Sequence, residues 1–138
     1  MKLNQNKGFT LLEIIIVIII VGVLASLALP RFFNTVEYSR STEGFASMAA
    51  LRGSMERCYL QSGNMASCTN VSTLDVEDPQ NSPNNHFTYS LAQSASNAYS
   101  IVASRNTRDN GSTTSTITMT TTSTGITRAG ATAFVGVK

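Results

Sequence analysis

The sequence contains one long apolar run, residues 9–29, which is interrupted by a single charged side chain. At a rise of roughly 1.5 Å per residue, this run forms a helix of about 32 Å, close to the roughly 30 Å thickness of the hydrocarbon core of a bilayer. Lys2 and Lys7 precede the run and no acidic residue does, which predicts that residues 1–8 stay cytoplasmic. The sequence therefore predicts a membrane-spanning N-terminal helix followed by an extracytoplasmic domain.

The charged side chain inside the run is Glu13. A carboxylate in an apolar span costs about 2.5 kcal/mol or more even on the lenient insertion scale, so it indicates a function or a partner. One alternative is a carboxylate that reaches the headgroups at the cytoplasmic end. Another is an ordinary secretory signal cleaved near Ala25, Ser26 and Ala28, although the run is longer than such a signal needs.

Residues 7–13 read KGFTLLE and lead directly into the apolar run. This string closely resembles the N-terminus of type IV prepilins and type II secretion pseudopilins, which carry a class III signal peptide, and the resemblance covers residues 1–30. It implies that a prepilin peptidase cleaves between Gly8 and Phe9 and that the new Phe9 amine is methylated. It also implies insertion into the inner membrane as a precursor, followed by export through a pilus assembly machinery.

Removal of residues 1–8 would give Phe9 an α-amino group with an ordinary pKa of about 7.7–8.0. Glu13 lies about 6 Å further along the helix axis, so a neighbouring helix displaced by roughly one turn brings its amine to this carboxylate. Each charge alone is unfavourable in an apolar bundle, whereas the two together largely cancel. We therefore expect Phe9 and Glu13 to be assembly residues whose pairing selects the axial step between subunits.

Gly22 and Pro30 weaken the same helix. Glycine costs roughly 1 kcal/mol in a helix interior and proline about 3 kcal/mol, the latter because it removes the hydrogen bond to the Ser26 carbonyl. In a membrane we expect the helix to persist with a kink near Pro30. Filaments of the family that this chain resembles contain an extended stretch here, which predicts local melting over residues 22–30; a simple proline kink is the alternative.

Beyond Pro30, apolar side chains recur every three or four residues, which predicts an amphipathic continuation of the helix over residues 31–63. The apolar face of this continuation is expected to pack on a sheet. Its members are Phe45, Met48, Leu51, Met55 and Tyr59. Glycine and asparagine are typical of a left-handed helix end, so the helix should stop near Ser62, Gly63 and Asn64.

The remaining residues, 64–138, are expected to form a globular head with a loop over 64–85 and a sheet over about 86–138. Apolar and polar side chains alternate with the period of strands, and turn residues separate the alternating segments. The expected strands lie near residues 87–91, 99–104, 115–121 and 131–137. The predicted fold class is α+β, with the long helix packed on a small antiparallel sheet of three to four strands.

Cys58 and Cys68 are the two cysteines of the chain. One pair closing a short loop is typical of a disulfide and has too few ligands for a structural zinc site, so it predicts an oxidising compartment. A reactive thiol pair is the alternative, but the spacing is not CxxC.

Composition and charge argue against several classes of function. Of ten basic and eight acidic residues, two basic ones lie in the leader, so the remainder is balanced at eight to eight, which argues against nucleic-acid binding. Arg105 and Arg108 are too few to form a basic patch. The single histidine, His86, is expected in an exposed loop, and we predict no catalytic residues, metal or cofactor.

The sequence thus favours a structural subunit that polymerises through its helix into a type IV pilus, a surface fimbrium serving motility, adhesion or DNA uptake. A type II secretion pseudopilin is the first alternative, although major pseudopilins resemble one another in an acidic calcium loop that this chain lacks. A minor pilin acting as a binding module is the second, and a membrane-tethered enzyme the weakest. Many pilins carry their disulfide in the C-terminal region, whereas Cys58 and Cys68 follow the long helix here. The resemblance therefore does not assign a receptor-binding loop to this chain.

Overall fold

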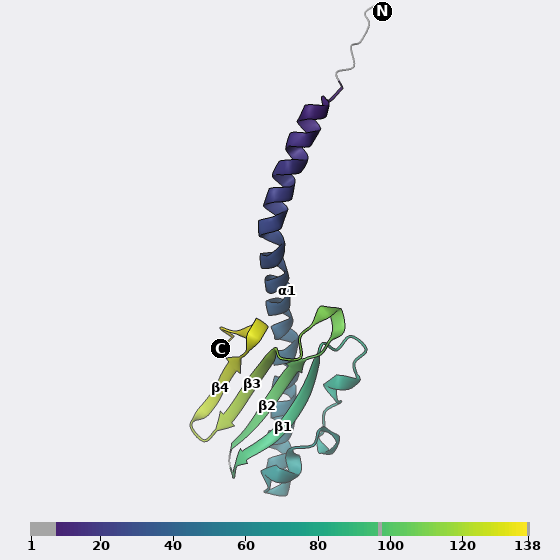
Figure 1. Cartoon of the computed structure of the whole chain (residues 1–138). Helices are drawn as coiled ribbons and strands as arrows, with labels where there is room; N and C mark the ends of the chain where they lie inside the picture. Colours follow the sequence, from purple (N-terminus) through teal and green to yellow (C-terminus); the bar gives the residue numbers. More distant parts are fainter. Residues whose placement is uncertain (1–7, 97, 138) are drawn as a thin grey trace, which may run out of the picture. The chain divides into compact units, whose positions relative to one another are not determined.

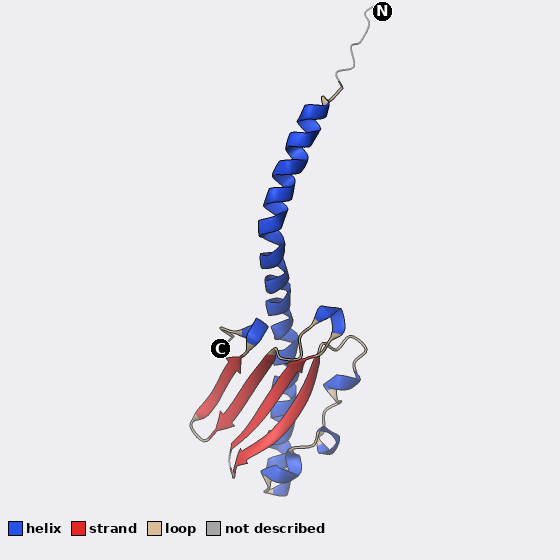
Figure 2. Ribbon diagram, viewed as in Figure 1, coloured by secondary structure: helices blue, strands red, loops and turns tan. Residues whose placement is uncertain are grey.

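The computed structural model describes residues 8–96 and 98–137. Residues 1–7, which include both lysines of the expected leader, lie outside the described residues. The chain divides into two compact units, Met1–Val36 and Glu37–Lys138. The expected fold class is confirmed, because one long helix precedes a four-stranded antiparallel sheet (Figures 1 and 2).

Helix α1, Leu11–Ser62, is a single helix of 52 residues. It ends at Gly63, which has a φ of 68° and whose N–H donates to the Tyr59 carbonyl at 2.8 Å. Glycine adopts this left-handed conformation without a Cβ penalty, which is why it terminates so many helices. The expected helix end near Ser62 and Gly63 is therefore confirmed.

Helix α1 passes through Gly22 and Pro30 without interruption. A Cβ on Gly22 would meet no atom within 4 Å, so no close contact within the single chain requires this glycine. The Ser26 hydroxyl donates to the Val23 carbonyl at 2.7 Å, which satisfies one backbone acceptor in the weakened stretch. The single chain keeps residues 22–30 helical, while the proline kink and the melting in a filament stay predictions.

The second unit contains a sheet with strand order β1-β2-β3-β4, in which each strand pairs antiparallel with the next along the chain (Figure 1). The strands are β1 Phe87–Ala95, β2 Ala98–Arg105, β3 Thr116–Thr122 and β4 Gly125–Gly130. Ile101 lies opposite both Leu91 and Met119, so these apolar side chains share one face of the sheet. Serine and threonine side chains occupy most of the opposite face.

The predicted fourth strand was wrong, because residues 131–137 form no strand and Gly125–Gly130 does. The chain turns back at Gly125, which has a φ of 143°, so the strand starts immediately after β3. After Gly130 the backbone folds over itself, and a Cβ there would lie 1.9 Å from the Phe134 carbonyl oxygen. A short 3₁₀ turn, Thr132–Phe134, then buries Phe134 in the core.

The predicted apolar face of α1 is confirmed as the helix side of the core. Met48, Leu51 and Met55 are fully buried, while Phe45 and Tyr59 are partly buried at its margin. Full burial of each aliphatic side chain contributes about 1.5–3 kcal/mol. Across the interface the sheet supplies side chains that include Phe87, Ile101 and Ile117, all 0% exposed.

The segment between helix and sheet contains three short 3₁₀ turns, Met65–Cys68, Val71–Thr73 and Pro79–Asn81. A side-chain oxygen caps each turn, so this predicted loop has local order but no long element. The expected disulfide is present between Cys58 and Cys68, with the Cα atoms 5.8 Å apart. It ties the first turn to the last part of α1.

Asp75 also holds this segment on the helix. It accepts hydrogen bonds from the Arg57 guanidinium at 2.6 and 2.8 Å and from the Ser54 hydroxyl. The bond with Arg57, followed by that with Ser54, holds the pKa of the Asp75 carboxyl well below its usual range. The loop is thus attached to α1 by one covalent and one ionic contact.

Candidate functional site

The candidate functional site is the N-terminal part of α1, which presents an almost unbroken apolar surface. From Phe9 to Phe33, the large apolar side chains are at least 40% exposed, and Phe9 reaches 85%. Soluble monomers rarely expose contiguous apolar patches larger than a few hundred Å², so this surface requires lipid or other chains as neighbours. By length and composition, α1 is long and apolar enough to cross a membrane.

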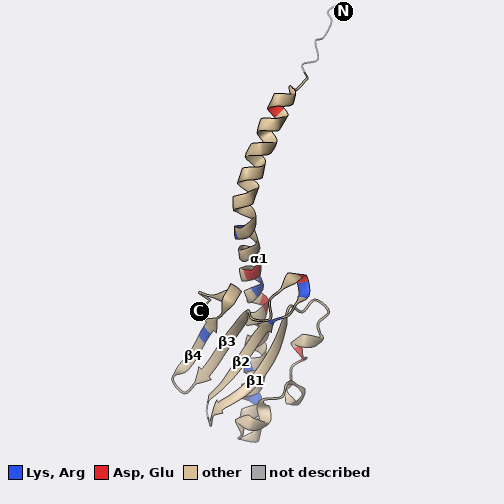
Figure 3. Cartoon of the chain, in the orientation of Figure 1, with Lys and Arg blue, Asp and Glu red and all other residues tan. Residues whose placement is uncertain are grey.

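Glu13 is the single charged residue between Gly8 and Pro30. Figure 3 shows an acidic position near the start of α1. Its carboxylate accepts hydrogen bonds from the Thr10 N–H and the Thr10 hydroxyl, each at 2.8 Å. In return, the Glu13 N–H donates to the Thr10 Oγ1 at 3.2 Å. This reciprocal pattern is a capping box, which satisfies two donors that the helix would otherwise leave unpaired.

The sequence analysis missed this second role of Glu13. The signal was present, because threonine followed three residues later by glutamate is the pattern of a capping box. Gly8 and Phe9 precede α1 and are exposed, so the structure places the expected cleavage site outside the helix. The same few residues therefore combine the expected processing site, the start of the helix and the one charge of the apolar segment.

His86 lies in the loop just before β1, as expected, but its side chain is not exposed, so that part of the prediction was wrong. Its side chain is 19% exposed, with Nδ1 2.7 Å from a Glu43 oxygen and Nε2 3.0 Å from an Asp109 oxygen. Hydrogen bonding to His86 is the main cause that lowers the pKa of the Asp109 carboxyl. These partners lie 43 and 23 residues away in the chain, so no local pattern could have indicated them.

Arg105 is fully buried beside this cluster and is not part of a basic surface. Its guanidinium donates to the Glu37 carboxylate at 3.0 and 3.2 Å, to the His86 carbonyl at 3.1 Å and to the Arg108 carbonyl at 2.9 Å. Arg40 completes the cluster by pairing with both Glu37 and Asp109. Each carboxylate here has a cationic or imidazole partner, so the arrangement holds α1, β1 and the β2–β3 connection together.

The cluster offers no clear chemistry beyond this structural role. Across residues 8–96 and 98–137, no group of three or more histidine, cysteine or acidic residues is placed to hold a metal ion. The candidate functional residues that remain are those of the apolar segment, namely Gly8, Phe9, Thr10 and Glu13.

Comparison with known proteins supports the importance of this segment. The family model described as "Prokaryotic N-terminal methylation motif" matches residues 3–29. The chain is 34% identical over 65 residues to the type IV major fimbrial protein FimA of Dichelobacter nodosus, covering 47% of this chain and 42% of that protein. It is 34% identical over 67 residues to the type IV narrow pilus major component PilA5 of Thermus thermophilus, covering 49% and 58%.

A third relative, fimbrial protein Q of Moraxella bovis, is 44% identical over 48 residues, covering 35% of this chain and 31% of that protein. The chain thus spans about half the length, or less, of the curated relatives that it matches. All three of these relatives are named as fimbrial or pilus proteins.

Proposed function

We propose that this chain is a type IV pilin, a structural subunit of a type IV pilus, because its N-terminus matches the methylation motif and its relatives are named as type IV fimbrial or pilus proteins. The observation that carries the proposal is the exposed apolar half of α1 with one carboxylate at its start. Such a surface fits a bilayer before assembly and a bundle of identical helices afterwards. Two of the relatives are named as major components of type IV fimbriae or pili, which supports the same role here.

The proposal begins with processing at the inner membrane. A prepilin peptidase cleaves the Gly8–Phe9 bond, and the Phe9 amine is then methylated; the match of the methylation motif to residues 3–29 supports both steps. Both residues lie ahead of α1 and are exposed, so the peptide bond is accessible without unwinding the helix. Residues 1–8 are thus the leader.

Assembly then replaces the internal partner of Glu13 by an external one. In the single chain, the carboxylate accepts from Thr10. In the fibre, the Phe9 amine of a copy displaced by about 6 Å along the axis approaches it and supplies a full positive charge. At other displacements both charges would stay unpaired in an apolar bundle, which is unfavourable, so the exchange favours this displacement over others.

The same reasoning assigns the parts of the chain. Residues 9–30 form the core of the fibre, residues 31–63 connect this core to the head, and residues 64–138 form the outer surface. The precursor is located in the inner membrane, and the assembled homopolymer is a fimbrium at the cell surface.

Two substitutions at one position test the proposal. Glu13→Val removes the charge and the cap, whereas Glu13→Gln keeps a capping oxygen and removes only the charge. Both variants should remain in the membrane fraction and yield no ordered surface fibres when cells are sheared and examined by electron microscopy. N-terminal sequencing of wild-type fibres should begin at methylated Phe9.

Normal fibres from Glu13→Gln would contradict the charge pairing. A wild-type chain that gives no surface fibres and stays in the periplasm would contradict the pilus role and favour a pseudopilin. A mature chain that begins elsewhere than Phe9 would contradict the processing.

A further inference from the structure

Most charged side chains of the head have a partner within the chain, and the exceptions lie on two different surfaces. The described ion pairs engage Glu37, Glu43, Glu56, Asp75 and Asp109. Glu77 and Asp78 form no ion pair with a described residue, and neither does Arg128, whose guanidinium lies 5.6 Å from the centre of the Phe45 ring. The head therefore retains unpaired charges of both signs.

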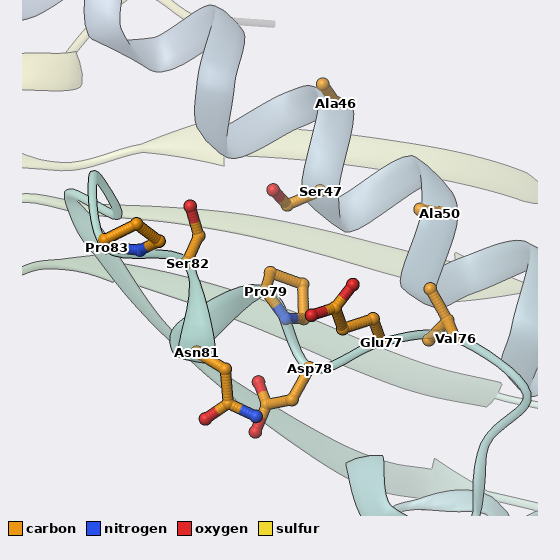
Figure 4. Close-up of a pocket in the computed structure, with 10 residues that line it drawn as sticks. All are labelled: Ala46, Ser47, Ala50, Val76, Glu77, Asp78, Pro79, Asn81, Ser82 and Pro83. Atoms are coloured by element: carbon orange, nitrogen blue, oxygen red, sulfur yellow. The ribbon is translucent and has the colours of Figure 1, made fainter.

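The unpaired acids line a groove of about 480 Å³ between α1 and the loop before β1. Ala46, Ser47 and Ala50 line the helix side, and Figure 4 shows Ser47 and Ala50 across from Glu77 and Pro79 of the loop. The helix wall consists of small side chains, so an incoming side chain can approach the backbone of α1 closely. At one end of the groove Arg108, which forms no ion pair with a described residue, donates to the Pro83 carbonyl.

The cation Arg128, which forms no ion pair with a described residue, lies on β4, an open edge of the sheet. Five of its six residues are exposed, and Ile126 is 42% exposed despite its apolar side chain. Ile126 pairs with Thr121 and Arg128 pairs with Met119, so both side chains point to the face of the sheet that packs on α1. An apolar and a cationic side chain thus stand next to each other along one free edge.

These two surfaces lie at opposite edges of the same head. Figure 1 shows the loop beside β1 and the hairpin end with β4 at the other side of the sheet. An open strand edge is a ready surface for another chain, and native proteins rarely leave one without a charge or a cover. Because the two surfaces differ, contact between them is heterologous and does not close into a dimer.

We propose that the groove formed by residues 46–50 and 76–83 receives the β4 edge of a second copy of this chain. Ile126 of one copy packs on the small side chains of the groove of the next, and its Arg128 pairs with Glu77 there. Repetition of this contact links heads side by side around the fibre axis. The inference deepens the proposed function, on which it rests, by naming the head-to-head contact that supplements the helix bundle.

Cysteine cross-linking tests the contact in assembled fibres of the full chain. A chain carrying both Ile126→Cys and Ala50→Cys should give a ladder of covalent multimers on non-reducing gels after mild oxidation. The matched control combines Thr127→Cys with Ala50→Cys, because Thr127 lies on the same strand but points to the opposite face. This control, and each single cysteine variant, should show no ladder beyond a dimer.

Charge exchange provides a second readout that does not depend on new cysteines. Arg128→Glu alone should reduce the yield of sheared fibres about tenfold, since close interfacial charge pairs contribute more than about 1.4 kcal/mol. Combining Arg128→Glu with Glu77→Arg should restore most of the yield. Thr127→Glu, which adds an acid to the same strand on its other face, should leave the yield near that of the wild type.

The outcomes separate this inference from the proposed function. Absence of wild-type surface fibres refutes the pilus role. Wild-type fibres with no ladder from the Ile126→Cys and Ala50→Cys chain overturn the head contact alone. If that chain assembles no fibres, the charge exchange decides: recovery by the double variant supports the contact, and lack of recovery overturns it.

Discussion

The buried guanidinium of Arg105 allows a quantitative prediction, because Glu37 is its one carboxylate partner among the described residues. Glu37→Ala would leave a positive charge that is 0% exposed without a counter-charge. Breaking one side of a buried pair typically costs 3–5 kcal/mol, and the carboxylate is 24% exposed, so we expect about 3 kcal/mol. At roughly 4–8 °C per kcal/mol for a domain of this size, Tm of the head should fall by about 12–24 °C.

Scanning calorimetry of the full chain in detergent measures this loss. The detergent covers the apolar helix, while the head unfolds in water and gives the transition whose Tm is compared. Arg52→Gln is the matched control, because it removes a cation from the partly exposed helix pair with Glu56, which lies at 3.5 Å. Exposed pairs of this spacing contribute about 0.3–0.5 kcal/mol, so Tm should change by only a few degrees. A loss below about 1 kcal/mol in Glu37→Ala would refute the reasoning. It would show that the carbonyls around Arg105 and water suffice to satisfy its charge.

Three further perturbations follow from contacts in the head. Reducing the disulfide, which closes a loop with a sequence separation of 10, should lower the free energy of unfolding by about 2–3 kcal/mol in urea titrations. Gly130→Ala should cost about 1–3 kcal/mol by the same assay, because the new Cβ collides with the Phe134 carbonyl. Asp75 has a lowered pKa in the folded chain, so its pairing with Arg57 stabilises the fold above the unfolded pKa of about 3.9. That contribution is lost as the pH falls through the folded pKa, and Asp75→Asn should therefore weaken the acid dependence of stability below about pH 4.

Each of these has a clear contrary result. Unchanged urea midpoints after reduction would mean that the loop is held by its other contacts alone. A Gly130→Ala chain as stable as the wild type would show that the C-terminal turn is free to move away. If the stability of Asp75→Asn fell at low pH as steeply as that of the wild type, the acid sensitivity would come from other carboxylates.

The elements that depend on local pattern could be predicted from the sequence. The apolar run, the stripe containing Met48, Leu51 and Met55 and the helix end at Gly63 all follow from spacing within one or two turns. The first three strands follow from alternation along short segments. In each case the information lies in neighbouring residues.

The features that sequence reasoning missed depend on contacts between distant residues or on competing patterns. His86 and Arg105 owe their environment to carboxylates 43 and 68 residues away. The alternation near Phe134 resembled a strand. However, β4, which ends at Gly130, already pairs with β3 and forms the edge of the sheet. Tertiary packing then used Phe134 to close the core.

The placement of attachments along the second half of α1 has a mechanical consequence. The Glu37–Arg105 pair lies near one end of the part of the helix that carries the head, and the Cys58–Cys68 bridge lies near the other. In the proposed fibre, force that enters through α1 reaches the sheet through the Glu37–Arg105 pair and the buried core, and it reaches the loop through the Cys58–Cys68 bridge. Detachment would require several contacts to fail together, whereas a head fastened at one end would peel away one contact at a time.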